Sequence, residues 1–141
     1  MGGVRIVVGA AVVRDGRVLA ARRTRPAAAA GRWELPGGAV EPGEDEAAAL
    51  ARELREELDL DVVVGDRVGP EVTLPGERVL RIRSCRPGGE PTAREHDALR
   101  WVGPDELDGL DWLDADREVL PALAALLADG LTPPGPSSAP S

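Results

Sequence analysis

Apolar and polar positions along the chain fall into blocks that predict strands and helices. Residues 4–13 are mostly Val, Ile and Ala and predict a buried strand. The Asp-Gly pair at 15–16 predicts a hairpin turn into a returning strand over 17–22. From 44 to about 58, apolar residues recur at helical spacing and predict the clearest helix of the chain.

Shorter patterns complete the expected set of elements. A short strand is expected over 32–38, ending in a tight Gly turn. Three further strands are expected, over 61–68, 78–85 and 98–102. A short helix starts at Pro104, and a last helix over 114–130 is expected to bend or restart at Pro121. Strands with helices between and after them predict an α/β fold, with a mixed sheet between helices.

Length and composition indicate one globular domain. The chain has 141 residues, of which 43% are hydrophobic and 30% charged, which suits a single core. We expect a domain over 1–131 and a disordered Pro- and Ser-rich tail over 132–141. No apolar stretch approaches the ~20 residues that span a bilayer, and the first residues lack a signal-peptide pattern. A cytoplasmic location and no membrane partner are therefore expected.

Charge and rare residue types narrow the function further. The net charge is −8, which argues against nucleic acid as a partner because phosphate backbones need a basic face. Cys85 is the single cysteine, which excludes internal disulfides and cysteine-rich zinc sites. Phe and Tyr are absent, so a nucleotide base would have to stack on Trp33 or Trp112. Otherwise hydrogen bonds must provide selectivity.

An acidic stripe lies beside the buried face of the predicted helix. Glu46, Glu53, Glu56 and Glu57 share this stripe, and like charges at these spacings cost about a few tenths of a kcal/mol per pair. Arg52 reaches Glu56 at i+4, but no basic residue stands three or four places from Glu53 or Glu57. Carboxylates near a Gly turn are ligands for a hard dication such as Mg²⁺ or Mn²⁺. The ordinary alternative is a solvated acidic helix face.

The residues around this helix resemble the box of the Nudix hydrolase family. The matching residues are Gly38, Glu44, Arg52, Glu53, Leu54, Glu56, Glu57 and Leu60. One position departs from the family pattern, because Asp59 stands where the family has a helix-ending Gly. Asp tolerates a left-handed backbone better than most residues, so a small stability cost and an intact metal site are expected. The resemblance implies a Nudix-type α/β/α sandwich.

The resemblance also implies which residues hold and orient a metal. Glu53, Glu56 and Glu57 would bind the ion together with the carbonyl of Gly37 or Gly38. Two further residues have supporting roles, in which Arg52 orients a glutamate and Glu44 supports the helix start and the metal waters.

Similarity beyond the box points towards the MutT-like branch, which removes oxidised guanine nucleotides. Glu95 and Glu53 are joint candidates for the general base. The implied substrate contacts are Arg23, Leu35, Arg78 and Asp116, where the arginines bind phosphate or sugar, Leu35 lies under the base and Asp116 reads the purine edge. Each has a plain alternative: surface arginines, a core leucine and a helix N-cap.

The implied activity is Mg²⁺- or Mn²⁺-dependent hydrolysis of a (deoxy)nucleoside triphosphate, with 8-oxo-dGTP as the favoured substrate. The products would be the monophosphate and pyrophosphate. The alternatives are a cytidine nucleotide, ADP-ribose or a biosynthetic diphosphate, or a non-catalytic nucleotide-binding module. The sequence leaves open the substrate, the identity of the base, the number of ions and the oligomeric state.

Overall fold

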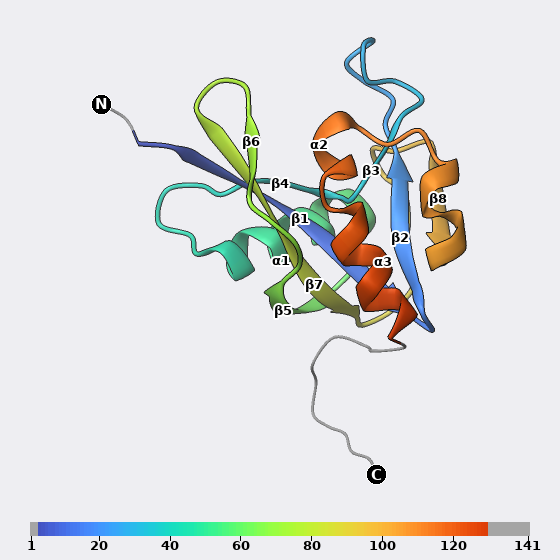
Figure 1. Cartoon of the computed structure of the whole chain (residues 1–141). Helices are drawn as coiled ribbons and strands as arrows, with labels where there is room; N and C mark the ends of the chain where they lie inside the picture. The colour runs from blue at the N-terminus through green and yellow to red at the C-terminus, as the bar shows by residue number, and fades with distance from the viewer. Residues whose placement is uncertain (1–2, 130–141) are drawn as a thin grey trace.

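The computed structural model describes residues 3–129 and shows a mixed sheet between helical layers (Figure 1). The strands are β1 (Arg5–Arg14), β2 (Arg17–Arg22), β3 (Trp33–Glu34), β4 (Gly37–Ala39), β5 (Val62–Arg67), β6 (Val72–Leu74), β7 (Arg78–Pro87) and β8 (Ala98–Val102). The helices are α1 (Glu46–Leu58), η1 (Pro104–Gly109), α2 (Asp114–Arg117) and α3 (Leu120–Ala128). The expected α/β sandwich with a mixed sheet is therefore confirmed.

Strand β1 organises the sheet and changes partner along its length. On one side it runs parallel to β7 from Arg5 to Val12. On the other side, its first half pairs antiparallel with β4, and its end pairs with β2. The chain segment that joins β3 to β4 therefore crosses the point where β1 passes from one neighbour to the other. Gly37 and Gly38, which the sequence placed in a tight turn, instead begin β4 and pair with Gly9 and Val8 of β1.

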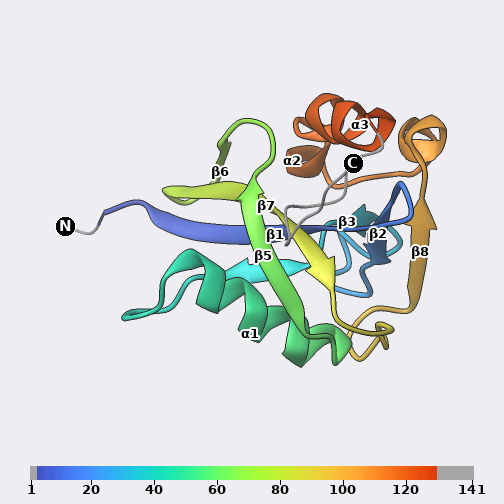
Figure 2. The ribbon, with the colours of Figure 1, turned by 90° about the horizontal axis from the view of Figure 1, so that it is seen from below.

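Alternating side chains of β1 feed two separate cores. Val8, Ala10 and Val12 pack with the leucines of α1, whereas Ala11 and Val13 pack with α3, η1 and the segment around Trp112. Figure 2 shows α1 on one face of the sheet and α2 and α3 on the other. Each large aliphatic side chain buried in this way contributes roughly 1.5–3 kcal/mol to stability. The period-two pattern of a doubly covered strand thus produces both layers.

Helix α1 has a defined start and end. At its start, the Asp45 side chain accepts a hydrogen bond from the Ala48 N–H at 2.7 Å, as an N-cap residue does. At its end, Asp59 adopts the left-handed conformation, with φ 51° and ψ 41°, and its N–H bonds to the Arg55 carbonyl. Asp59 therefore takes the C-cap role that the sequence predicted for it.

Several elements differ from expectation. Strand β6 was not predicted, because its three residues are too short for a period to show. The segment from Pro104 is a 3₁₀ helix. The last helix is interrupted between α2 and α3, with Pro121 in the first turn of α3, which confirms a restart at that proline. The predicted tail over 132–141 and the end of the domain lie outside the described residues. Within residues 3–129, no helix is long and apolar enough to cross a membrane.

Candidate functional site

Gly37 and Gly38 at the start of β4, which we call the glycine pair, pack between β1 and the acidic side of α1. A Cβ atom placed on Gly38 would lie 2.4 Å from Cδ and from Oε2 of Glu53. One placed on Gly37 would lie 1.9 Å from the carbonyl oxygen of Val8. Neither position has room for a side chain, because the glycine pair lies tightly between β1 and the Glu53 carboxylate. The predicted carbonyl ligands and one predicted carboxylate ligand are therefore next to each other.

Glu53, Glu56 and Glu57 of α1 form what we call the acidic cluster. Arg52 neutralises much of its charge. Its Nε donates to Glu44 Oε2 at 2.7 Å, and its Nη1 reaches Glu53 and Glu56 at 3.2 and 3.3 Å. The hydrogen bond from Arg52 lowers the pKa of Glu44 to about 2, with a smaller contribution from the Glu41 N–H. No basic residue stands three or four places from Glu53, but the adjacent Arg52 reaches its carboxylate.

Glu57 is the acid that this arrangement leaves unbalanced. Its relative exposure is 7%, and its Oε1 atom has no hydrogen-bond partner. Burial, the hydrogen bond with Glu53 and the charges of Glu34, Glu53 and Glu95 together raise its pKa to about 9. A buried carboxylate without a cation is costly. The geometry therefore fits a divalent ion, which would pair the orphan oxygen beside Glu53.

Glu46 does not belong to this cluster. Its carboxylate pairs with Arg81 and, at 3.3 Å, with Arg83, both on β7. The sequence grouped Glu46 with the other three glutamates because they share a helical stripe. The first turn of α1 instead lies against a pair of arginines from the sheet, so this part of the prediction is corrected.

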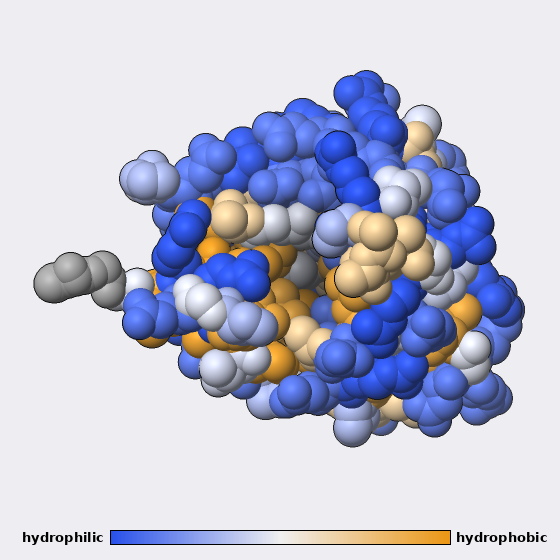
Figure 3. All heavy atoms as spheres, turned by 90° about the horizontal axis from the view of Figure 1, so that it is seen from above, coloured by the Kyte–Doolittle hydropathy of each residue, from blue (hydrophilic) through white to orange (hydrophobic). Residues whose placement is uncertain are grey.

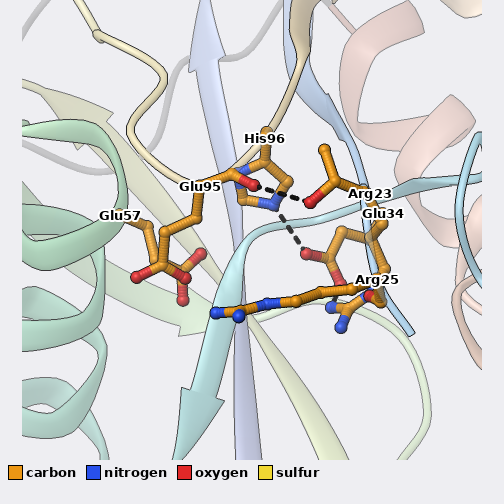
Figure 4. Close-up of a pocket in the computed structure, with 7 residues that line it drawn as sticks. Arg23, Arg25, Glu34, Glu57, Glu95 and His96 are labelled. Carbon is orange, nitrogen blue, oxygen red and sulfur yellow. Dashed lines mark hydrogen bonds and ion pairs between the residues drawn. The ribbon is translucent and has the colours of Figure 1, made fainter. Parts of the chain in front are cut away.

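Beside the cluster lies a small hollow, which we call the acidic hollow, with a volume of about 50 Å³. It is lined by Arg23, Thr24, Arg25, Glu34, Glu57, Glu95 and His96. Figure 4 shows the Glu57 and Glu95 side chains pointing toward one another, with the Arg25 guanidinium extending toward them. Glu95, a candidate base, is thus next to a candidate metal ligand.

A second cavity, the apolar hollow, adjoins the first and has a volume of about 280 Å³. All four predicted substrate contacts line it, together with the glycine pair: Arg23, Leu35, Gly37, Gly38, Arg78 and Asp116. Figure 3 shows a hollow on the upper face of the molecule, with apolar patches in its walls and polar residues around it. Arg23 and Glu34 line both hollows, so the two form one continuous site.

Asp116 is a buried acid in the wall of the apolar hollow. Its Oδ2 accepts a hydrogen bond from the Leu35 N–H at 3.0 Å. Burial raises its pKa to about 7, although the Leu35 N–H acts in the opposite direction. Leu113 is the N-cap of α2 and Asp114 pairs with Arg32, so Asp116 is not the helix cap that was its alternative. Leu35 is a core residue and also lines the hollow.

The arginines of the site differ in how far they are already engaged. Arg23 donates to Glu34 at 2.9 Å, and Arg78 donates its Nε to the Pro75 carbonyl at 2.9 Å. Arg25 lines the acidic hollow with an exposed side chain. Sequence reasoning missed Arg25, which stands in a loop with no periodic signal.

Glu34 and His96 were also missed. His96 Nε2 lies 2.8 Å from Glu34 Oε2, and each of Glu34, Glu57 and His96 offers a ligand atom within 4.8 Å of the other two. His96 is the single histidine of the chain, so no histidine cluster was expected. The structure instead groups it with two carboxylates, and sequence spacing alone gave no signal of this.

Neither tryptophan that the sequence considered is available for stacking. Trp112 is fully buried and donates its Nε1–H to the Leu107 carbonyl at 2.7 Å. Trp33 packs against the core with the Arg22 guanidinium 5.6 Å from its ring centre. Neither lines the two hollows described above. Aliphatic side chains and hydrogen-bonding groups therefore form the apolar hollow.

Comparisons with known proteins agree with this geometry. The family model of the NUDIX domain matches residues 3–123. "Putative 8-oxo-dGTP diphosphatase 2" of Mycobacterium tuberculosis is 54% identical over 127 residues, which cover 87% of this chain and 90% of that protein. The CTP pyrophosphohydrolase of Escherichia coli is 38% identical over 86% of this chain and 93% of its own length. The solution structure of the E. coli ORF135 protein superposes with a TM-score of 0.77 at 37% identity, covering 90% and 93% of the two chains.

Proposed function

The chain belongs to the Nudix hydrolase family, and we propose that it hydrolyses a nucleoside triphosphate to the monophosphate and pyrophosphate in the presence of Mg²⁺ or Mn²⁺. The favoured substrate is 8-oxo-dGTP, because the relative that is 54% identical is named as an 8-oxo-dGTP diphosphatase. One observation carries the proposal: the acidic cluster and the apolar hollow meet at Gly37 and Gly38. A ligand with a base at one end and a polyphosphate at the other matches such a site.

At the phosphate end, the acidic cluster of Glu53, Glu56 and Glu57 would hold the ion together with a carbonyl of the glycine pair. The orphan Oε1 of buried Glu57 supports this assignment. The ion would offset the phosphate charge and lower the pKa of a water that it binds. Arg52 holds Glu53 and Glu56 in place through its hydrogen bonds. A fixed carboxylate pair loses little freedom when an ion binds.

Glu95 is the stronger of the two candidates for the general base. Glu53 is confined between Gly38 and Arg52, which suits a metal ligand. Glu95 lies at the acidic hollow with an exposed side chain, where it can accept a proton from the attacking water. The proton then leaves to solvent, and the pyrophosphate leaves from the other side of the phosphorus.

Arg25 and Arg23 supply the positive charge around the phosphates. Arg25 extends toward Glu57 and Glu95 (Figure 4), so its guanidinium can pair with a terminal phosphate that the ion draws in. Arg23 already pairs with Glu34, and it lines both hollows.

At the base end, hydrogen bonds provide selectivity. Asp116 uses one oxygen for the Leu35 N–H, which leaves the other for an N–H of the base, while Leu35 contacts the ring. A site built on buried polar groups rejects a ligand that leaves those groups unpaired far better than an apolar slot does. Oxidation of guanine converts N7 into an N–H donor, which an acidic acceptor can recognise.

The test is formation of the nucleoside monophosphate, followed by chromatography with Mg²⁺ and with EDTA, across the common and 8-oxo (deoxy)nucleoside triphosphates, including CTP, and ADP-ribose. We expect metal-dependent turnover with at least a tenfold preference for 8-oxo-dGTP. Glu53→Gln and Glu57→Gln should each abolish most of it, whereas Glu118→Gln, at an exposed position that lines neither hollow, should not. Strong turnover of another nucleotide would replace the substrate and keep the chemistry. No turnover of any member would refute the proposal.

A further inference from the structure

The position of Glu95 depends on the segment that connects β7 to β8. Residues 88–97 connect β7 to β8 without regular structure, and the Glu95 side chain is exposed. The backbone on either side is tied at separate points. The Arg94 N–H donates to the Glu57 carbonyl at 3.0 Å, and the Asp97 N–H donates to the Arg22 carbonyl at 3.2 Å. These bonds fix the chain near Glu95 but do not fix its side chain.

His96 is the buried anchor of this segment. Its side chain is 5% exposed, that of Glu34 is 12% exposed, and their Nε2 and Oε2 atoms are 2.8 Å apart. Since an ionised carboxylate only accepts hydrogen bonds, Nε2 carries the proton and donates. Figure 4 shows this bond between His96 and Glu34. The Glu95 backbone is also held, because Thr24 Oγ1 donates to the Glu95 carbonyl at 3.3 Å.

Glu34 is in turn fixed from the other side. Its second oxygen accepts from Arg23 at 2.9 Å, and β3, which carries it, is hydrogen-bonded to β2. The imidazole is therefore held by a carboxylate that a strand and an arginine both restrain. A buried, charge-assisted bond of this kind is short and resists rearrangement.

We propose that Glu34 and His96 form a positioning pair that sets the place of the Glu95 carboxylate over Glu57. The proposal rests on the proposed function, because Glu95 acts there as the proton acceptor. In this role His96 acts through its neighbour in the chain and not on the substrate or the ion. A displacement of a catalytic group by about 1 Å can cost about 100-fold in rate, so the effect on turnover is large.

Two substitutions of similar polarity separate positioning from general structure. In His96→Gln, the side-chain amide nitrogen stands where the imidazole Nε2 was and can still donate to Glu34. In His96→Asn, the amide is one methylene shorter and does not reach. We expect kcat to fall less than fivefold in the first variant and about 30- to 100-fold in the second. KM and the Kd for Mn²⁺, measured by titration without substrate, should stay within threefold in both variants.

A readout that needs no turnover keeps the proposal separate from the proposed function. Amide hydrogen exchange at Arg94 and Asp97 should quicken in His96→Asn and remain near wild type in His96→Gln. This difference is expected even if none of the nucleotides tested is a substrate. Thermal unfolding of both variants checks that they are folded.

Three results would overturn the proposal. The first is a kcat of His96→Asn within threefold of wild type in an active enzyme. The second is equal exchange at Arg94 and Asp97 in both variants. The third is a tenfold or greater loss of Mn²⁺ affinity in both, which would make Glu34, Glu57 and His96 ligands of an ion instead, as their 4.8 Å grouping allows.

Discussion

Replacing Gly38 with alanine tests the contact between the glycine pair and the Glu53 carboxylate of α1. The new Cβ would lie 2.4 Å from Cδ of Glu53, and ordinary contact begins near 3.4 Å, so the carboxylate must retreat by about 1 Å. Because Glu53 is the far end of a flexible side chain, the protein can fold around this change. The retreat weakens the 3.2 Å bond from Arg52 and moves a proposed metal ligand. We expect kcat to fall about 100-fold and the Kd for Mn²⁺ to rise tenfold or more, about 1.4 kcal/mol.

Two other alanine substitutions provide the controls. Gly109 has nothing within 4 Å of an added Cβ, so Gly109→Ala should leave both constants unchanged. Gly37→Ala would place a Cβ 1.9 Å from the Val8 carbonyl oxygen, where the backbone of β1 cannot retreat, so this variant should fail to fold. Mn²⁺ titration, steady-state kinetics and circular dichroism distinguish the cases. Wild-type Mn²⁺ affinity and turnover in a folded Gly38→Ala protein would refute the placement of the ion between the glycine pair and Glu53.

Further substitutions test the helix cap, the buried acid and the corrected glutamate. Asp59→Gly should stabilise the protein by about 1 kcal/mol in denaturant unfolding, because Gly adopts the left-handed cap without strain; no gain would contradict this account of the cap. The folded pKa of Asp116 is raised to about 7, above the unfolded value of about 4. The stability of the wild type should therefore fall relative to Asp116→Asn as the pH rises through this window, by up to about 1.4 kcal/mol per unit, and parallel curves would disprove the shift. Glu46→Gln should lower stability by about 1–3 kcal/mol through Arg81 and Arg83 and leave Mn²⁺ affinity unchanged; weaker Mn²⁺ binding would return Glu46 to the metal site.

The parts of the fold that the sequence predicted well are those with local causes. The buried strand at the start of the chain, the hairpin at 15–16 and the amphipathic helix each follow from residue spacing within one element. The cap at Asp59 follows from one residue in one conformation. Strand β6 was missed because three residues carry no measurable period, and the pairing that defines it comes from β7.

The site was predicted where its residues stand close together in the chain or match the family box. Glu34 could not be found in this way, because its contacts with Arg23 and His96 span 11 and 62 residues. Glu46 was misplaced for the same physical reason. A helical stripe records which residues share a face, but not that Arg81 and Arg83 on a distant strand lie opposite its first turn.

The spacing between the metal end and the base end of the proposed site is set by residues 34–38, which are anchored to two strands. Strand β3 is bonded to β2, where Trp33 faces Arg22, and β4 is bonded to β1, where Gly37 faces Gly9. Residues 34–38 are therefore fixed at both ends, and they contribute to the acidic cluster and to the apolar hollow alike. In the proposed site, this segment sets the distance between the base and the phosphate. A change of substrate must come from side chains that line the apolar hollow, such as Asp116, while the metal end keeps its geometry.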